Sequence, residues 1–413
     1  MVWFYTSHNG GSIQEGLTMA DSERGAELLA AEAVRADGGL ADVQYEHAEG
    51  LIDLTWGHPD PSTFASADIA AAAAATAGKW QSLTYGFAAG AGYTRAAIAA
   101  HLSATDCPTA AEDVIVTAGS SGGLDLLLTM LAHPGDVVFV EQPTYFLALR
   151  MFADHGLRVV GLMSDGDGPR ADVFAAAAAV AGANGRSVFL YLVPTFANPT
   201  GRCMPQARQR ELLDAAAGVG AYVIDDDAYR DTAAVAPPSM WSLDHRVLRL
   251  GSFSKSLSPG LRVGYLTADA AMVQRVAGCG LLDSGGGVNH FASMMVGELL
   301  RTGRFREIAA AAAARYAARR AALAAALDPS VFTFDVPDGG YFLWLGLPDG
   351  VSSAAAVAAA KAAGVLVANG RNFCVDEPSE GFVRVSFSLL HEGLLAEGAR
   401  RLNTAVAALH AAN

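Results

Sequence analysis

The chain has 413 residues, of which 52% are hydrophobic, and it carries a formal net charge of −14. A chain of this length fills more than one small core, which predicts two domains or one large domain with a lobe. The acidic balance argues against nucleic acid or an anionic membrane as a partner, but it allows a local positive pocket for a phosphate.

Residues 1–55 are expected to form an N-terminal arm and a helix over 23–36, which belong to the small domain. The first residues lack the basic and apolar regions of a secretory signal. No stretch offers the ~20 apolar residues that a membrane span needs. The four cysteines are scattered without C-x-x-C spacing, which favours reduced thiols, no metal site and a cytoplasmic location.

The middle of the chain alternates short apolar runs with alanine-rich helical runs. Such runs are typical of strands that are buried on both faces of a parallel sheet. The pattern predicts an α/β fold, with a large domain over residues 56–288 that holds a mostly parallel seven-stranded sheet between helices. The predicted strands cover residues 113–119, 136–143, 158–163, 187–194, 221–227, 246–252 and 262–267.

The pattern changes at about residue 289. A long helical region over 307–327 is followed by two strand-like pieces, GGYFLWLGLP and GFVRVSFS, and by a final helix from about Glu392. This indicates a smaller α+β domain over residues 289–413. Alanine is the best helix former, so the alanine runs are interpreted as packed helices.

Only three lysines occur in the chain, and one of them, Lys255, follows an apolar strand in the segment SFSKSLSPGLRVGY. Lys79 and Lys361 lie in alanine-rich surroundings. A lysine that forms an imine must be near neutral, so burial or a nearby cation has to lower its pKa. Arg262, seven positions on, is a candidate for that cation. The local pattern alone is equally compatible with a lysine that pairs with a carboxylate.

Three consecutive acids, Asp225 to Asp227, end another apolar strand. Ligands of parallel α/β sheets bind at this edge, where a carboxylate can pair with a protonated pyridine nitrogen. Alternate strand residues point to opposite faces, so Asp225 and Asp226 cannot both face one site. The sequence does not choose between them, and three solvated acids are the plain alternative.

Two turns have the composition of ligand-binding loops. The turn AGSSGGLDLLL contains Ser120 and Ser121 before a predicted helix and resembles a phosphate cradle. Asn198 lies in PTFANPTG, where two prolines and a glycine stiffen the loop after a strand. Each pattern alone is common in ordinary turns.

In combination, these segments resemble the class I/II aminotransferases, which are pyridoxal-5′-phosphate (PLP) enzymes of fold type I. The family pattern N-P-T-G, D-x-x-Y, S-x-S-K and P-G-x-R-x-G is present in order, from about residue 50 to the end. PTFANPTG and GSFSKSLSPGLRVGY are most similar to the aminoadipate-type aminotransferases and the C-terminal domains of MocR regulators.

The resemblance implies a role for each matching residue. Lys255 forms the Schiff base with PLP and moves the substrate proton, and Asp226 pairs with the pyridine nitrogen. Arg384 grips the substrate carboxylate, beside Asn198 and with Gly57 leaving room for the substrate. The remaining cofactor contacts are ring contacts by Tyr145, Tyr229 and Asn198, and phosphate contacts by Ser120, Ser121, Ser252, Ser254 and Arg262, with Tyr85 reaching the phosphate from the other subunit of a homodimer.

The chain departs from the family pattern in the segment DSGGGVNHF, which spans residues 283–291. Its three glycines are expected to make it open and flexible. It contains no arginine for a second substrate carboxylate, which weighs against a dicarboxylate-specific enzyme. His58 and Asp283 are candidates for the substrate pocket, although a structural or exposed position is the favoured interpretation of each.

The leading functional hypothesis is an aminotransferase that moves an amino group between an α-amino acid and a 2-oxo acid. The same scaffold supports decarboxylation, substitution, elimination, oxidation and carbon–carbon bond formation, so a different PLP reaction is the alternative. A ligand sensor of the MocR kind is disfavoured, because only about 50 residues precede the resemblance.

Overall fold

The structure is a computed structural model that describes residues 50–183, 185–375 and 380–412. The chain divides into two compact units, Met1–Leu51 and Ile52–Asn413. The helix expected over residues 23–36 lies outside the described residues.

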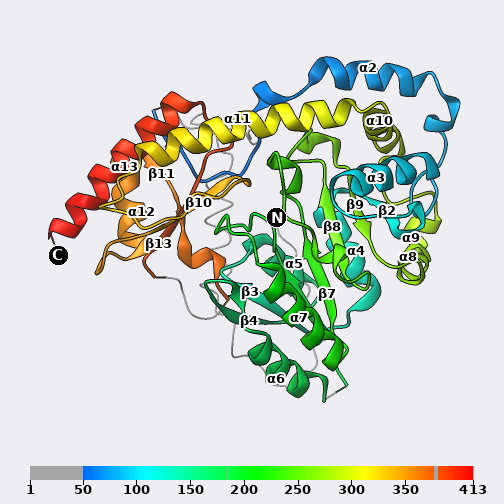
Figure 1. The fold of residues 1–413 in the computed structure, drawn as a ribbon, viewed down its shortest axis with the longest axis horizontal. Helices are drawn as coiled ribbons and strands as arrows, with labels where there is room; N and C mark the ends of the chain where they lie inside the picture. Colours follow the sequence, from blue (N-terminus) through cyan, green and yellow to red (C-terminus); the bar gives the residue numbers. More distant parts are fainter. Residues whose placement is uncertain (1–49, 184, 376–379, 413) are drawn as a thin grey trace, which may run out of the picture. The chain divides into compact units, whose positions relative to one another are not determined.

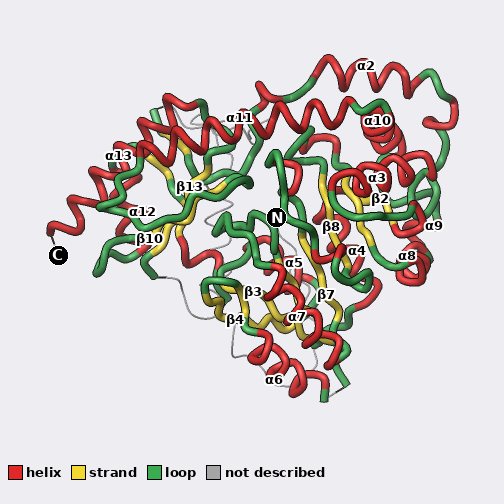
Figure 2. The backbone as a smooth tube through the Cα atoms, in the orientation of Figure 1, coloured by secondary structure: helices red, strands yellow, loops and turns green. Residues whose placement is uncertain are grey.

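A central eight-stranded sheet forms the larger part of this unit (Figures 1 and 2). Its order is β2-β9-β8-β7-β6-β3-β4-β5. The adjacent strands β4, β3, β6, β7 and β8 run parallel to one another, whereas β9 is antiparallel to both β2 and β8. The strands span β2 (Val114–Thr117), β3 (Val137–Gln142), β4 (Arg158–Asp165), β5 (Gly168–Pro169), β6 (Val188–Leu192), β7 (Tyr222–Asp226), β8 (Leu248–Ser252) and β9 (Gly264–Thr267).

All seven predicted strands occur in this sheet. The additional strand is β5, a two-residue edge strand antiparallel to β4. It contains one glycine and one proline, which carry no apolar strand signal, and proline is tolerated at a sheet edge.

Helices pack around the central sheet because its strands are apolar on both faces. Local signals set their ends. Gly220 takes a left-handed conformation just after α7, and the Asn289 side chain accepts from the Ala292 amide at the start of α10. These helices span α2 (Ser66–Ala77), α3 (Gly92–Thr105), α4 (Gly119–Leu131), α5 (Phe146–Asp154), α6 (Ala171–Gly182), α7 (Gln206–Val219), α8 (Ala270–Ala277), α9 (Gly280–Asp283) and α10 (His290–Arg301).

The C-terminal part contains two small sheets covered by helices, with strand orders β10-β13-β12 and β1-β11. The long helix α11 (Arg304–Ala326) leads into it, and Figure 1 shows this helix in yellow, running from α10 towards α13. The other elements are β1 (Ile52–Asp53), β10 (Phe342–Gly346), β11 (Val365–Leu366), β12 (Ala368–Asn369), β13 (Phe382–Ser386), α12 (Ser353–Ala362) and α13 (Glu392–Ala412).

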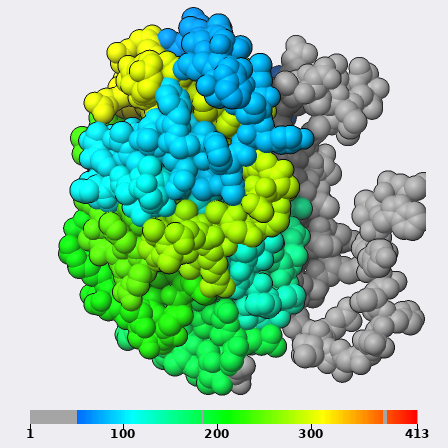
Figure 3. Space-filling model, turned by 90° about the vertical axis from the view of Figure 1, so that its right-hand side faces the viewer, coloured from blue at the N-terminus to red at the C-terminus, as the bar shows by residue number. Residues whose placement is uncertain are grey.

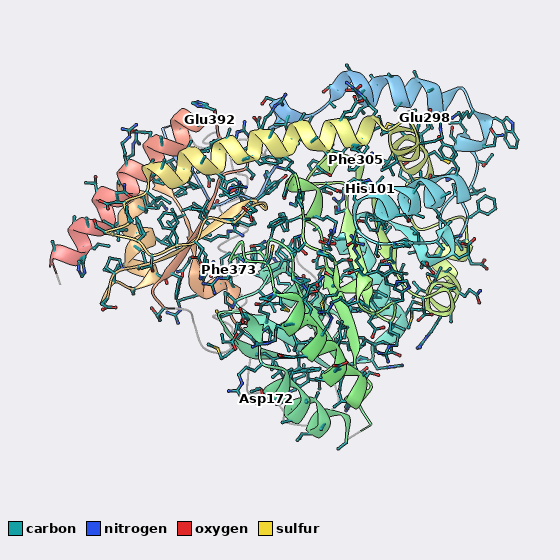
Figure 4. All side chains as sticks on the ribbon, viewed as in Figure 1. His101, Asp172, Glu298, Phe305, Phe373 and Glu392 are labelled. Carbon is teal, nitrogen blue, oxygen red and sulfur yellow. The ribbon has the colours of Figure 1, made fainter. Side chains whose placement is uncertain are left out.

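The helix α10 was expected in the small domain, but it packs against α2 and α3. Its buried face shares one hydrophobic cluster with Ile98, Val114 and Val263 of the larger part. Figure 4 shows the beginning of α11 at the same place, where Phe305 packs edge-on against His101 at 5.1 Å between ring centroids. The buried face of α10 and Phe305 of α11 therefore belong to the same hydrophobic cluster as these residues of the larger part.

Short 3-10 helices connect several of these elements, at Pro61–Thr63, Trp80–Leu83, Ala111–Asp113, Arg230–Thr232, Met240–Ser242, Pro259–Leu261 and Gly370–Phe373. None of the helices in the described ranges is both long and apolar enough to cross a membrane.

Candidate active site

Lys255 lies in the turn that follows β8, at the carboxyl end of the parallel strands. Its Nζ donates a hydrogen bond of 3.1 Å to the carbonyl oxygen of Gly57. The same nitrogen lies 5.7 Å from the ring centroid of Tyr229 and 5.5 Å from that of Tyr341. Burial lowers the pKa of Lys255 to about 8, an effect that Asp226 opposes and that the cationic Arg384 and Arg262 reinforce. At neutral pH the neutral amine is thus the minor form, but it is far more populated than in an ordinary lysine.

Asp226, at the end of β7, faces the same side of the sheet as the ring of Tyr191 on β6. The Tyr191 hydroxyl donates a hydrogen bond of 2.7 Å to Asp226 Oδ2. The other oxygen, Oδ1, is buried and has no hydrogen-bond partner among the described residues. Burial raises the pKa of Asp226 to about 6, and the bond from Tyr191 opposes this rise. One carboxylate oxygen is thus held in place while the second is open to a donor.

Asp225 and Asp227 point to the opposite face of β7. Asp227 Oδ2 lies 2.6 Å from Arg230 Nε and 2.8 Å from Arg249 NH2, and all three side chains are buried. Asp225 accepts from the backbone amide of Met240. Burial and the neighbouring Asp227 raise the pKa of Asp225 to about 8. This face is a structural ion-pair network, whereas Asp226 faces Tyr191 on the other side.

The predicted phosphate contacts gather at the N-terminus of α4. No side chain caps this helix end, so its first amide groups are available to an anion. Arg262 donates to the Ala118 carbonyl at 3.2 Å and reaches Ser254 Oγ at 3.5 Å. Ser254 is joined in turn to Ser252 through a bond from its amide to the Ser252 hydroxyl.

Gly119 has a structural reason to be glycine in this cluster. Its φ is +77°, and a Cβ there would lie 2.9 Å from NH2 of Arg262. A side chain would both strain the turn and fill the space beside the guanidinium. Ser120 is partly buried and Ser121 is exposed, both in the first turn of α4.

Arg384 on β13 joins the C-terminal sheet to the loop that carries Asn198. Its NH1 donates to Asn198 Oδ1 at 2.8 Å, and its NH2 donates to the Thr55 carbonyl. The guanidinium carbon lies 4.0 Å from the ring centroid of Phe342 and 4.8 Å from that of Phe373. Burial lowers the pKa of Arg384 to about 10, which leaves it charged at neutral pH. Its Nε is buried with no hydrogen-bond partner among the described residues.

Gly57 also has a structural reason to lack a side chain. A Cβ on Gly57 would lie 2.4 Å from the Phe342 ring. Phe373 is labelled in Figure 4, where the C-terminal part meets the central sheet, and its carbonyl accepts the Thr144 amide at 2.8 Å. The Arg384 site is therefore enclosed by aromatic rings.

Two tyrosines line the space between Asp226 and Arg384. Tyr229 is buried, and its hydroxyl is hydrogen-bonded to Asn198. Tyr145 lies just before α5, and burial raises the pKa of its hydroxyl to about 12. The charges of Asp226, Arg384 and Arg262 all affect the pKa of Tyr145. Tyr145 therefore lies among these three residues, which are the predicted partners of the pyridine nitrogen, the substrate carboxylate and the phosphate.

Tyr85 stands apart from this group, with 87% of its surface exposed. Its ring packs against the glycine segment, where a Cβ on Gly285 would lie 2.7 Å from it. The amide of Gly86 donates to the Gly285 carbonyl at 2.9 Å. Gly285 and Gly286 have φ of +136° and +90°. The positive φ of both residues and the approach of Tyr85 to Gly285 account for glycine at these two positions. Asp283 is exposed at the end of α9, and the ring of His58 stacks on Trp56.

These residues fit PLP. An open buried oxygen of Asp226 matches a protonated ring nitrogen, and the uncapped α4 terminus with Arg262 matches a phosphate. Lys255, with its lowered pKa, matches an aldehyde. The carboxylate of Asp226, the guanidinium of Arg262 and the amine of Lys255 therefore occur in one site.

Sequence reasoning missed five aromatic residues of this site: Tyr191, Tyr316, Tyr341, Phe342 and Phe373. One signal was available for Tyr191, because a hydroxyl inside a buried apolar strand needs a partner. For the others the contacts join segments far apart in the chain, and no local pattern announces them.

Comparison with known proteins places this site in a family. The model of the family "Aminotransferase class I and II" matches residues 50–402. A 2-aminoadipate transaminase of Thermus thermophilus is 31% identical over 87% of this chain and 91% of its own length. An aromatic-amino-acid aminotransferase of Thermococcus litoralis is 29% identical over 85% of this chain and 87% of its own.

A solved structure agrees. The α-aminoadipate aminotransferase LysN of Thermus thermophilus, complexed with N-(5′-phosphopyridoxyl)-L-leucine, superimposes with a TM-score of 0.77 at 30% identity. The match covers 88% of this chain and 94% of LysN. The fold is that of the fold-type-I PLP-dependent transferases. The chain belongs to the aminotransferase class I and II family, its cofactor is PLP, and its reaction is transamination.

Proposed function

We propose that Lys255 is the lysine that binds PLP covalently and moves the substrate proton in an amino-group transfer from an α-amino acid to a 2-oxo acid. The observation that carries this proposal is the convergence of Lys255, Asp226 and Arg384. Lys255 carries a lowered pKa, Asp226 has an open oxygen, and the charge of Arg384 acts on Lys255. Lys79, by contrast, is bound to Glu298 at the protein surface.

Bound PLP supplies an electron sink for the Cα–H bond of the amino acid and carries its amino group. In this assignment Asp226 Oδ1 would accept a hydrogen bond from the protonated pyridine nitrogen, while Tyr191 keeps the carboxylate oriented. Asn198 and Tyr229 bind the ring hydroxyl, and Tyr145 covers the ring face. The α4 terminus, Ser120, Ser121, Ser252, Ser254 and Arg262 hold the phosphate.

Arg384 is proposed to bind the substrate α-carboxylate. Asn198 and the Thr55 carbonyl orient the guanidinium, and the Phe342 and Phe373 rings exclude water from it. A fixed guanidinium presents a planar fork that matches a carboxylate. As a free amine at the carboxyl edge of the sheet, Lys255 Nζ would take the proton from the substrate Cα and deliver it to C4′ of the cofactor.

We also propose a homodimer in which Tyr85 reaches the phosphate of the partner's site. Exposed large apolar side chains gather on two segments that are hydrogen-bonded to each other: Trp80, Leu83, Tyr85, Phe87 and Leu281. On the face in Figure 3, the blue chain segment borders the yellow-green one. Apolar groups exposed in this way favour burial against a second copy. Sedimentation of wild type and Trp80→Asp tests this proposal, with a dimer expected to become a monomer.

Two further proposals concern organisation and location. The two domains are proposed to meet along α11, with the larger extending from residue 56 through α10 and the C-terminal α+β part forming the smaller. A cytoplasmic location is proposed because the four cysteines are scattered without the spacing of a disulfide framework.

The test of the function is a single turnover of the PLP-loaded protein with a panel of amino acids, including aromatic residues, 2-aminoadipate and alanine. Mass spectrometry should detect the matching 2-oxo acid and pyridoxamine phosphate in equal amounts. Arg384→Lys keeps the charge but loses the fork, so KM for the amino acid should rise roughly tenfold or more. Products that retain the amino group, or that have lost CO2, would contradict transamination.

A further inference from the structure

The main-chain carbonyl of Lys255 is held by two tyrosines of the C-terminal part. The Tyr341 hydroxyl donates to this carbonyl oxygen at 2.6 Å, and the Tyr316 hydroxyl lies 3.3 Å from it. The two hydroxyl oxygens are 3.0 Å apart. Tyr316 comes from α11 and Tyr341 directly precedes β10. Both tyrosines are at most 1% exposed.

Tyr341 contacts the same lysine at its other end. Its ring centroid lies 5.5 Å from Lys255 Nζ, within range of a cation–π contact. Its ring also packs edge-on against Tyr229 at 5.4 Å and against Tyr316 at 4.9 Å. Tyr341 therefore contacts both the backbone and the amine of Lys255, and it is itself fixed by two neighbouring rings.

The turn itself does not supply these bonds. Leu257 and Ser258 donate their amides to the Phe253 carbonyl. Among the backbone hydrogen bonds of the described loops and turns, none ends on the Lys255 carbonyl. A buried carbonyl needs a donor, and here that donor comes from residues 61 and 86 positions further along the chain.

We propose that Tyr341 and Tyr316 are positioning residues that fix the backbone from which the Lys255 amine reaches the cofactor. The inference rests on the proposed role of Lys255 and extends it, because the C-terminal part then sets the reach of a lysine that belongs to the larger part. A lysine side chain is long and flexible, so its amine is only as well placed as its Cα.

The step that depends on this placement is covalent attachment. The neutral amine of Lys255 adds to the aldehyde carbon of PLP, the nitrogen loses its two protons, and the aldehyde oxygen leaves as water. No oxidant or reductant is required. The rate depends on the approach of Nζ to that carbon, and misplacement by about 1 Å costs up to about 100-fold. Noncovalent binding of PLP uses the phosphate and ring contacts instead, so it should not depend on either tyrosine.

The experiment mixes apo-protein with PLP in a stopped-flow spectrometer. A phase whose rate depends on PLP concentration reports noncovalent binding, and a concentration-independent phase reports attachment. Tyr341→Phe keeps the ring and removes the hydroxyl, so the attachment phase should slow about tenfold while the binding phase stays unchanged. Tyr316→Phe should slow attachment less, because its bond is longer, and the double variant should slow it more than either. Tyr93→Phe, which loses a hydroxyl bonded to Glu298 away from the site, is the matched control.

The outcomes separate this inference from the proposed function. Attachment within twofold of wild type in Tyr341→Phe and in the double variant would overturn the inference and leave Lys255 intact. Equal slowing of both phases with a lowered Tm would also overturn it, because the tyrosines would then support the fold in general. If Tyr341→Phe does not fold, Tyr316→Phe decides by the same criteria. An attachment phase that persists in Lys255→Ala would overturn the proposed function itself.

Discussion

Tyr191 and Asp226 lie on adjacent parallel strands, and the tyrosine donates a 2.7 Å hydrogen bond to one carboxylate oxygen while the other stays open. Both side chains are buried. A buried carboxylate is costly unless donors stabilise it. Tyr191 therefore helps to keep Asp226 charged and oriented for the cofactor nitrogen.

Tyr191→Phe should weaken PLP binding, because the variant leaves Asp226 with no side-chain donor. A hydrogen bond to a charged group is worth about 1.5–3 kcal/mol, so the loss should be at least tenfold. Fluorescence titration of apo-protein with PLP measures it. The effect should vanish in an Asp226→Ala background, as expected for coupled residues. Tyr222→Phe, on the neighbouring strand, serves as control. If Tyr191→Phe weakened PLP binding equally in the Asp226→Ala background, the coupling between the two residues would be refuted.

Asp227→Asn should mainly lower the stability of the protein, whereas Asp226→Asn should mainly weaken PLP binding. Removing the charge of Asp227 leaves Arg249 and Arg230 buried with less compensation, which should cost about 3–5 kcal/mol of unfolding free energy. Asp226→Asn should leave stability unchanged or higher, because burial already disfavours its charge, and should weaken PLP binding roughly 100-fold. Urea unfolding and PLP titration of both variants test this. A large loss of stability in Asp226→Asn together with a large loss of PLP binding in Asp227→Asn would contradict the prediction.

The reactivity of Lys255 should report its lowered pKa. Acetic anhydride reacts with neutral amines only, so acetylation of Lys255 in apo-protein should be half-maximal near pH 8 and level off about one pH unit higher. Mass spectrometry of the Lys255 peptide gives this profile, with Lys79 and Lys361 in the same sample as internal references. A rate that still climbs steeply beyond pH 9.5 would show that burial does not lower this pKa, given an ordinary lysine pKa of ~10.4.

Arg262→Gln should weaken binding of PLP but not of pyridoxal, which lacks the phosphate. The loss expected for charge-assisted hydrogen bonds is about 1.5–3 kcal/mol, or roughly 10- to 150-fold. Arg275→Gln is the control, since its guanidinium contacts Tyr222 at the surface. Equal weakening of both ligands in Arg262→Gln would mean that this arginine supports the site in some other way.

Much of the central sheet could be predicted from the sequence, because each long strand is a near-continuous apolar run. The two-residue β5 carries no such signal. The place of α10 depends on which hydrophobic cluster its buried face joins, and periodicity alone does not specify that partner. The tight packing around Gly285 was missed for the same reason, since the contact with Tyr85 comes from a segment 200 residues away.

The candidate site divides in the same way. Lys255, Arg262 and Asn198 lie in motifs whose residue types indicate their chemistry. The preference for Asp226 over Asp227 depends on which side of β7 each side chain occupies. That side is defined by spatial neighbours such as Arg249, which the sequence does not indicate. The tyrosines that contact Asp226 and Lys255 do so across strands or between distant segments, where sequence spacing carries no information.

The most direct test of the account is to identify the lysine that holds PLP. The chain has only Lys79, Lys255 and Lys361, so reduction of the PLP-loaded protein with borohydride followed by peptide mapping gives an unambiguous answer. The account predicts one phosphopyridoxyl group per chain on Lys255, and none in Lys255→Ala. Stoichiometric label on Lys79 or Lys361, or its retention in Lys255→Ala, would contradict the proposed active site.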